Sequence, residues 1–153
     1  MNLKNFLTLT VRTVDFNLVA RQPELLAQLR KLTLSPYSGL NHELNRMLED
    51  VKTRSVNCQV LLAYRFRKLV GWGILSKETT HYSFSRSYEG FKSENGMMFQ
   101  VFVDPSYRRQ GIASEIYKKA QQLTNNETLH VCPWDDRSTN FYIRSSRVQT
   151  KWL

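Results

Sequence analysis

The sequence has few of the residues that build metal sites, disulfide frameworks or membrane spans. Its 153 residues include only 2 cysteines and 3 histidines, and neither type has the spacing of metal ligands. We therefore expect Cys58 and Cys132 to be reduced thiols. No apolar stretch reaches the roughly 20 residues of a membrane helix, and the N-terminus lacks the apolar segment of a signal peptide. These absences predict a cytoplasmic protein with no metal and no membrane partner.

Basic blocks are also missing, although the chain is basic overall. The formal net charge is +9, from 22 Lys and Arg against 13 Asp and Glu. The excess is spread along the chain, without the Lys/Arg run that marks a nucleic-acid tail. The one dense cluster, Arg65, Arg67 and Lys68, has the position of a hairpin turn. The charge therefore permits nucleic acid or a phosphate-rich cofactor as a partner without requiring either.

The chain does contain a regular succession of strand and helix patterns. Alternating or continuous apolar residues predict strands at 6–12, 59–64, 69–76, 97–103, 128–132 and 148–153. Caps, breakers and helical apolar spacing predict helices from Pro23 to Ser35, from Asn41 to about Val51, from Gly111 to Leu123 and from Asp136 or Ser138 to about Ser145. This order is mixed α/β, with helices packed on a sheet, in a length that suits one domain.

The segment from Arg108 to Ala113 is the one best suited to chemistry, because it joins a buried strand to the start of a helix. A helix N-terminus offers unpaired amides and about half a positive charge. The small residues Gly111 and Ala113 let phosphates approach the backbone closely, and Arg108 and Arg109 add charge-assisted hydrogen bonds. The junction is therefore suited to a pyrophosphate. Gly71-x-Gly73 lies inside a strand and opens no helix, so it is not a dinucleotide fingerprint.

Two motifs in the sequence resemble those of the GNAT N-acetyltransferase superfamily. Arg108-x-x-Gly111-x-Ala113, after a Val-x-Val-x-Pro strand end, resembles the acetyl-CoA signature Gln/Arg-x-x-Gly-x-Gly/Ala. Asn140-Phe141-Tyr142, after strand 128–132, resembles the second cofactor motif of that family. The resemblance covers almost the whole chain. It implies one GNAT-like domain over residues 1–153, an α/β fold with a mixed central sheet flanked by helices, and transfer of an acetyl group from acetyl-CoA to an amine.

The resemblance also implies roles for particular residues. The amides from Arg108 to Ala113 would hold the pyrophosphate, and the strand 100–103 would pair with the pantetheine arm and polarise the thioester carbonyl. Tyr142 would donate a proton to the departing thiolate, and the amine would attack directly, without a covalent enzyme intermediate. The implied catalytic residues are Tyr142 and Gln100. The implied cofactor-binding residues are Val101, Val103, Arg108, Arg109, Gln110, Gly111, Ile112, Ala113 and Asn140.

Three departures from the family pattern leave alternatives open. Gln100 stands where many members carry a Glu that acts as the general base. The base in this chain is therefore water, Glu94 or His81, or the reaction needs no base. Ser146-Arg147 replaces a usual Gly-Phe, and the sequence has room for one terminal strand, which a partner chain of a homodimer could supplement. Tyr142 could instead pack in the core, and Asn140 could only start a helix.

The acceptor and the rival functions are less closely constrained by the sequence. The region 81–91 interleaves aromatics with Arg86 and is expected to form an acceptor wall that favours an apolar or anionic body beside the amine. Two rivals remain. One is a catalytically weak module of the same fold that binds coenzyme A or a macromolecule, and the other is an acyltransferase acting on nucleic acid or charged tRNA.

Overall fold

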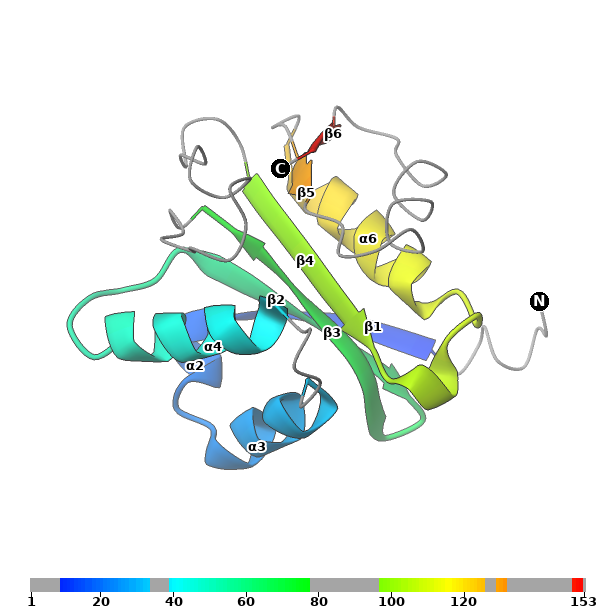
Figure 1. Cartoon of the computed structure of the whole chain (residues 1–153), viewed down its shortest axis with the longest axis horizontal. Coiled ribbons are helices and arrows are strands. Elements are labelled where there is room, and N and C mark those ends of the chain that lie inside the picture. The colour runs from blue at the N-terminus through cyan, green and yellow to red at the C-terminus, as the bar shows by residue number, and fades with distance from the viewer. Residues whose placement is uncertain (1–8, 34–38, 78–96, 126–128, 132–149, 153) are drawn as a thin grey trace.

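The computed structural model describes residues 9–33, 39–77, 97–125, 129–131 and 150–152, which form a mixed α/β sheet with helices on both faces (Figure 1). In chain order the elements are β1 (Leu9–Asp15), α2 (Phe16–Val19), α3 (Pro23–Leu32), α4 (Gly39–Asp50), β2 (Cys58–Arg65), β3 (Lys68–Ser76), β4 (Met97–Val103), the 3-10 helix η2 (Pro105–Tyr107), α6 (Ile112–Leu123), β5 (Leu129–Val131) and β6 (Thr150–Trp152). No helix in these ranges is long and apolar enough to cross a membrane.

The sheet has six strands in the order β1-β2-β3-β4-β5-β6, which is also their order in the chain. The first four strands are antiparallel neighbours. The pairs β4–β5 and β5–β6 are parallel, and α6 supplies the crossover from β4 to β5 that a parallel pair requires. The mixed central sheet flanked by helices that the sequence predicted is therefore confirmed.

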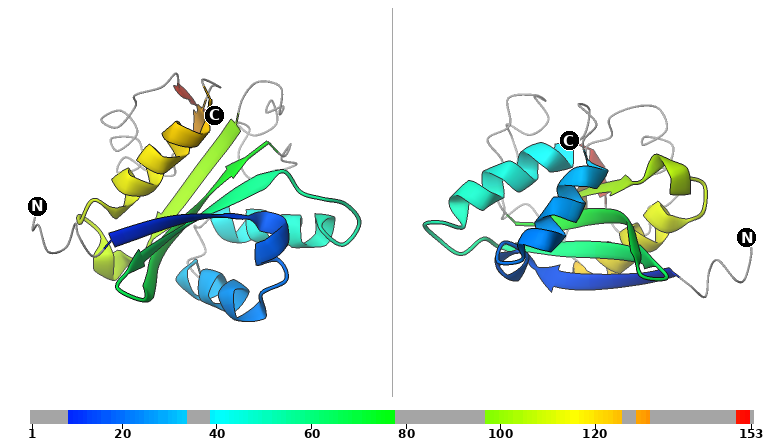
Figure 2. Two further views of the ribbon diagram at one scale, coloured as in Figure 1. Left: turned by 180° about the vertical axis from the view of Figure 1, so that it is seen from behind. Right: turned by 90° about the horizontal axis from the view of Figure 1, so that it is seen from below.

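The two faces of the sheet carry different helices, as Figure 2 shows. Helices α2, α3 and α4 cover one face, where their apolar side chains pack on Trp72, Ile74 and Met98. Helix α6 covers the other face, where Ile116 and Tyr117 pack with Phe99 and its neighbours. Successive side chains of a strand point to opposite faces, so the continuous apolar run of β4 serves both cores at once.

Close packing between α6 and the sheet depends on Gly73 in the middle of β3. A Cβ at this position would lie 2.6 Å from the carbonyl oxygen of Gln100 and 3.3 Å from Cγ2 of Ile116. The first contact is with backbone, which cannot move aside without disturbing the sheet. Gly71-x-Gly73 thus lies inside β3, as expected, and Gly73 allows β4 and α6 to approach closely.

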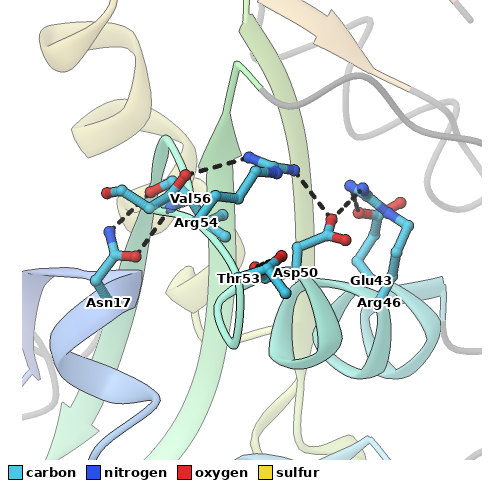
Figure 3. A network of polar contacts seen from close by, with 8 residues as sticks. Asn17, Glu43, Arg46, Asp50, Thr53, Arg54 and Val56 are labelled. Atoms are coloured by element: carbon cyan, nitrogen blue, oxygen red, sulfur yellow. Dashed lines mark hydrogen bonds and ion pairs between the residues drawn. The ribbon is translucent and has the colours of Figure 1, made fainter.

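A chain of polar contacts fixes α4 and the turn that follows it (Figure 3). Asp50 accepts from Arg46 at 3.1 Å and from Arg54 at 3.0 Å, and Arg46 also pairs with Glu43 at 2.9 Å. The Glu43 side chain is fully buried. Beside this chain, the Asn17 side chain accepts from the Val56 amide at 2.9 Å and donates to its carbonyl at 2.8 Å. These contacts set the path by which the chain leaves α4 and enters β2.

Some predicted boundaries are corrected by the structure. The first strand runs to Asp15, beyond the expected end at residue 12, because the Asp15 side chain caps the unpredicted helix α2 by accepting from the Asn17 amide at 2.8 Å. Asn41 lies within α4 and is not its cap, since the helix already begins at Gly39 and Leu40 joins the buried apolar stripe. Residues 6–8 and the helix expected near 136–145 lie outside the described residues.

Candidate cofactor and catalytic site

The end of β4 directs its backbone groups in two alternating directions. The Asp104 amide donates to the Val70 carbonyl at 2.9 Å, which continues the β3–β4 ladder one step past Val103. In an antiparallel ladder every second residue forms the hydrogen-bonded pair, so Gln100 and Phe102 bond to β3. Val101 and Val103 consequently point their amides and carbonyls toward the β5 side.

The β4–β5 ladder, within the described residues, pairs Met97 to Phe99 with Leu129 to Val131. Val101 lies two residues beyond this ladder and has its amide and carbonyl on that same side. The Val103 carbonyl accepts a hydrogen bond from Nε of Arg108 at 3.3 Å. Val101 is therefore better placed than Val103 to pair with an extended ligand arm entering beside β4.

The connection from β4 to α6 is a tight turn that ends in two left-handed residues. The Asp104 side chain accepts from the Ser106 amide at 2.9 Å, which starts the single turn of η2. Arg109 then has φ of 64° and Gly111 has φ of 78°. Glycine adopts this conformation without a steric cost, whereas other residues do so at a cost. The backbone conformation therefore favours glycine at position 111.

The first turn of α6 presents backbone amides without a side-chain cap. Its N-cap residue is Gly111, which has no side chain to accept from them, and the helix then runs for 12 residues. Ile112 is buried against the α6 face of the sheet, while Ala113 keeps the next position small. Uncapped amides at the positive end of a helix can accept an anion, which is the chemistry that the sequence motif suggests.

The two arginines of the motif occupy different environments. Arg108 places its guanidinium carbon 5.5 Å from the centre of the Phe102 ring, beside its bond to Val103. Its charged group therefore lies along the end of β4. Both residues are exposed, but Arg109 carries the left-handed backbone and has no such contact recorded among the described residues. In this arrangement Arg109 and the backbone amides offer the freer positive groups to an anion.

The structure adds Arg65 to the residues around this loop, a residue that the sequence assigned only to a basic turn. Arg65 Nη1 donates to Oε1 of Gln110, 45 positions away in the chain. Nζ of Lys68 lies 5.1 Å above the Tyr107 ring. The order of the elements already indicated this proximity. A β2–β3 hairpin whose second strand pairs antiparallel with β4 has its turn beside the end of β4.

Gln100, the residue at the expected position of the general base, is buried, with 4 % of its surface exposed. Its Nε2 lies 3.8 Å from the Met98 sulfur on the face covered by α4. A neutral amide in this environment cannot accept a substrate proton usefully. Tyr142, Asn140 and the alternative bases His81 and Glu94 lie outside the described residues.

Known proteins share both the sequence pattern and the fold. The model of the acetyltransferase (GNAT) family matches residues 26–145. No curated protein sequence matches the chain. Among solved structures, the aminoglycoside acetyltransferase meta-AAC0020 from an uncultured soil metagenomic sample, in complex with sisomicin, aligns with a TM-score of 0.59 at 16% identity, covering 92% of this chain and 89% of that one.

Two further structures give the same result. The aminoglycoside 6'-N-acetyltransferase AAC(6')-IG from Acinetobacter haemolyticus has a TM-score of 0.60 at 14% identity, with 94% of each chain covered. The aminoglycoside N-acetyltransferase AAC(6')-Iy in complex with CoA has a TM-score of 0.54 at 14% identity, covering 94% of this chain and 95% of that one. These likenesses concern the fold, while the family model spans most of the sequence. The chain belongs to the acetyltransferase (GNAT) family.

Proposed function

We propose that this chain transfers an acetyl group from acetyl-CoA to an amine. The observation that carries the proposal is the junction between β4 and α6. There an uncapped helix start, a left-handed Gly111 and the backbone of Val101 are brought together at one end of the central strand. The family relation and the AAC(6')-Iy complex with CoA support the choice of cofactor.

The residues of the junction suit the two polar parts of acetyl-CoA. The amides of Gln110, Gly111, Ile112 and Ala113 would hold the pyrophosphate, with Arg109 adding charge. The backbone of Val101 would pair with the amides of the pantetheine arm, as an added strand does. When bound, acetyl-CoA supplies an acetyl group already activated as a thioester.

The catalytic part of the proposal depends on Tyr142. In the family motif this residue donates a proton to the leaving thiolate, which is general acid catalysis. Gln100 is buried and neutral, so it is assigned a structural or polarising role beside the reacting carbonyl. The acceptor amine would attack directly, in its neutral form, with its proton passing to water. This mechanism requires no covalent enzyme intermediate.

The net charge of the chain bears on the class of acceptor. Aminoglycosides are named for several structural neighbours, and these acceptors carry many positive charges. The present chain has a net charge of +9, which disfavours such acceptors by repulsion. An amine attached to an anionic or apolar body is therefore the preferred acceptor, and a charged tRNA falls within that class.

The first experiment measures binding and turnover in the purified protein. Calorimetry with acetyl-CoA should show binding, and acetyl-CoA at about 100 times its Kd should raise the free energy of unfolding by about 2.7 kcal/mol. Thiol release with a panel of amines should then identify the acceptor class. The panel includes sisomicin, spermidine, amino acid esters and an aminoacyl-tRNA.

Tyr142→Phe separates catalysis from binding. It should lower turnover by about 10²–10⁴-fold and leave acetyl-CoA affinity nearly unchanged, because only the hydroxyl is removed. Tyr64→Phe is the matched control, since Tyr64 lies on β2 and packs at the edge of the α3–α4 core. Binding without turnover on any acceptor would favour the non-catalytic module. Absence of acetyl-CoA binding would refute the proposed function.

A further inference from the structure

The turn of the β2–β3 hairpin lies beside the exit of β4, at the same end of the sheet as the junction with α6 (Figure 1). The register pairs Arg65 with Lys68 across the turn and Gly71 with Val103 across the next ladder. The turn itself consists of Phe66, which has φ of 57°, and Arg67. Lys68 is only three residues before Gly71, so the turn of the hairpin lies next to the residues that follow Val103.

The hairpin contacts two residues of the segment that precedes α6, Tyr107 and Gln110. The Lys68 ammonium lies over the Tyr107 ring at 5.1 Å, and a cation in this position is attracted by the negative face of the ring. Arg65 donates from Nη1 to the side-chain oxygen of Gln110. Arg65 is only 8% exposed and Gln110 is half-buried, so this contact is screened less by salt than a contact between two exposed groups.

Gln110 lies between the two left-handed residues of the loop. Arg109 has φ of 64° and Gly111 has φ of 78°. For a residue with a side chain such as Arg109, this conformation costs about 1–2 kcal/mol, and it persists only where the surroundings hold it in place. The bond from Arg65 holds the side chain of Gln110, the residue between these two.

We propose that Arg65 is a positioning residue for the anion-binding loop, acting through Gln110 from the β2–β3 hairpin. This rests on the proposed function, in which that loop holds the pyrophosphate of acetyl-CoA. Arg65 keeps the amides from Gln110 to Ala113 directed at one point, so less conformational entropy is lost when the anion binds.

The test is a double-mutant cycle on Arg65 and Gln110. Calorimetry with coenzyme A is carried out on the wild type, Arg65→Met, Gln110→Ala and the double variant. Each single variant should raise the Kd by about tenfold, which corresponds to about 1.4 kcal/mol. The Kd of the double variant should lie within about twofold of the Kd of the single variant that binds less tightly, since both substitutions break the same contact.

Arg67→Met is the matched control, because it removes the same charge from the same turn at an exposed position. Its Kd for coenzyme A should stay within about twofold of the wild type. Steady-state kinetics give a second readout. Arg65→Met should raise the KM for acetyl-CoA while kcat stays within about twofold, whereas general damage to the fold would lower kcat as well.

The outcomes separate this inference from the function on which it rests. Circular dichroism and thermal unfolding establish which variants are folded. If Arg65→Met does not fold, the Kd of Gln110→Ala for coenzyme A provides the test. Wild-type affinity in a folded Gln110→Ala variant would overturn the positioning role and leave the proposed function intact. Additive losses in the cycle, or an equal loss from Arg67→Met, would overturn it too. A wild type that binds no coenzyme A would overturn both.

Discussion

The segment from Glu43 to Arg54 holds several ion pairs between its own residues, whereas no ion pair recorded among the described residues involves the junction from Asp104 to Ala113. All four ion pairs recorded among the described residues join members of the first segment. In the junction, Asp104 caps a backbone amide, Arg108 bonds to a carbonyl and Arg109 is exposed. The next helix begins without a side-chain cap.

The difference follows from what each segment lies next to. Segment 43–54 packs α4 on the sheet and leads into β2, so an unpaired charge there would be costly to bury. The junction ends at the surface, where water or a ligand can satisfy amides and guanidinium groups. Charges that pair within the protein thus stabilise the fold, and the positive groups exposed at the start of α6 are those that the proposed function uses. Four experiments test this division, taken from the largest expected effect to the smallest.

Glu43→Ala should have the largest effect, on stability alone. It removes a fully buried carboxylate and leaves the mostly buried Arg46 with one partner fewer. Breaking a buried pair in this way costs about 3 kcal/mol. Urea unfolding should show a lower midpoint with an unchanged slope. The affinity of the folded variant for coenzyme A should stay within about twofold, and a tenfold loss would show that the two segments are coupled.

Gly111→Glu should have the opposite profile, with its main effect on binding. It places a side chain and a negative charge at the start of α6, where φ is 78°, and we expect coenzyme A affinity to fall by about 100-fold, or about 2.8 kcal/mol. Gly111→Asn is the matched control, because Asn tolerates the left-handed conformation and carries no charge. A loss as large in the Asn variant would mean that backbone strain, and not charge, controls the site.

Raising the salt concentration should distinguish the two segments without any substitution. Between about 0.1 M and about 1 M salt the Debye length falls from about 10 Å to about 3 Å. We expect coenzyme A affinity to fall on the order of tenfold, because the junction is open to solvent. The unfolding free energy of Glu43→Ala relative to the wild type should change little, since that pair is buried. Calorimetry and urea unfolding at both salt concentrations provide the two measurements.

Glu49→Ala should have the smallest effect, although it removes the same kind of pair from the same helix as Glu43→Ala. Glu49 and Lys52 pair at 2.9 Å, but their side chains are 73% and 65% exposed. An exposed pair of this spacing contributes at most about 0.5 kcal/mol. A loss of stability equal to that of Glu43→Ala would show that burial does not explain the difference between the two carboxylates.

Several local features could be predicted from the sequence because their causes lie within a few residues. The strand Met97–Val103 was predicted with both boundaries, since a continuous apolar run is broken at once by Asp104-Pro105. The helix ending at Leu123 was predicted from apolar spacing after Gly111. The start of that helix lies directly after Gly111, where the sequence placed it, and its role in anion binding stays a prediction. The short helix α2 escaped prediction because four residues are too few for a periodic pattern.

Apart from α2 and η2, the order of the described elements could be predicted from the sequence, as could the position of Gly111 and two arginines between β4 and α6. Which distant groups contact that junction depends on the tertiary structure. The contact of Arg65 with Gln110 depends on the registers of two successive ladders, and a shift of one residue in either would direct the arginine elsewhere. The position of the Arg108 guanidinium against Phe102 depends on where β4 ends in the sheet. Local patterns specify elements through short-range sterics and periodicity, whereas such contacts depend on how whole elements pack together.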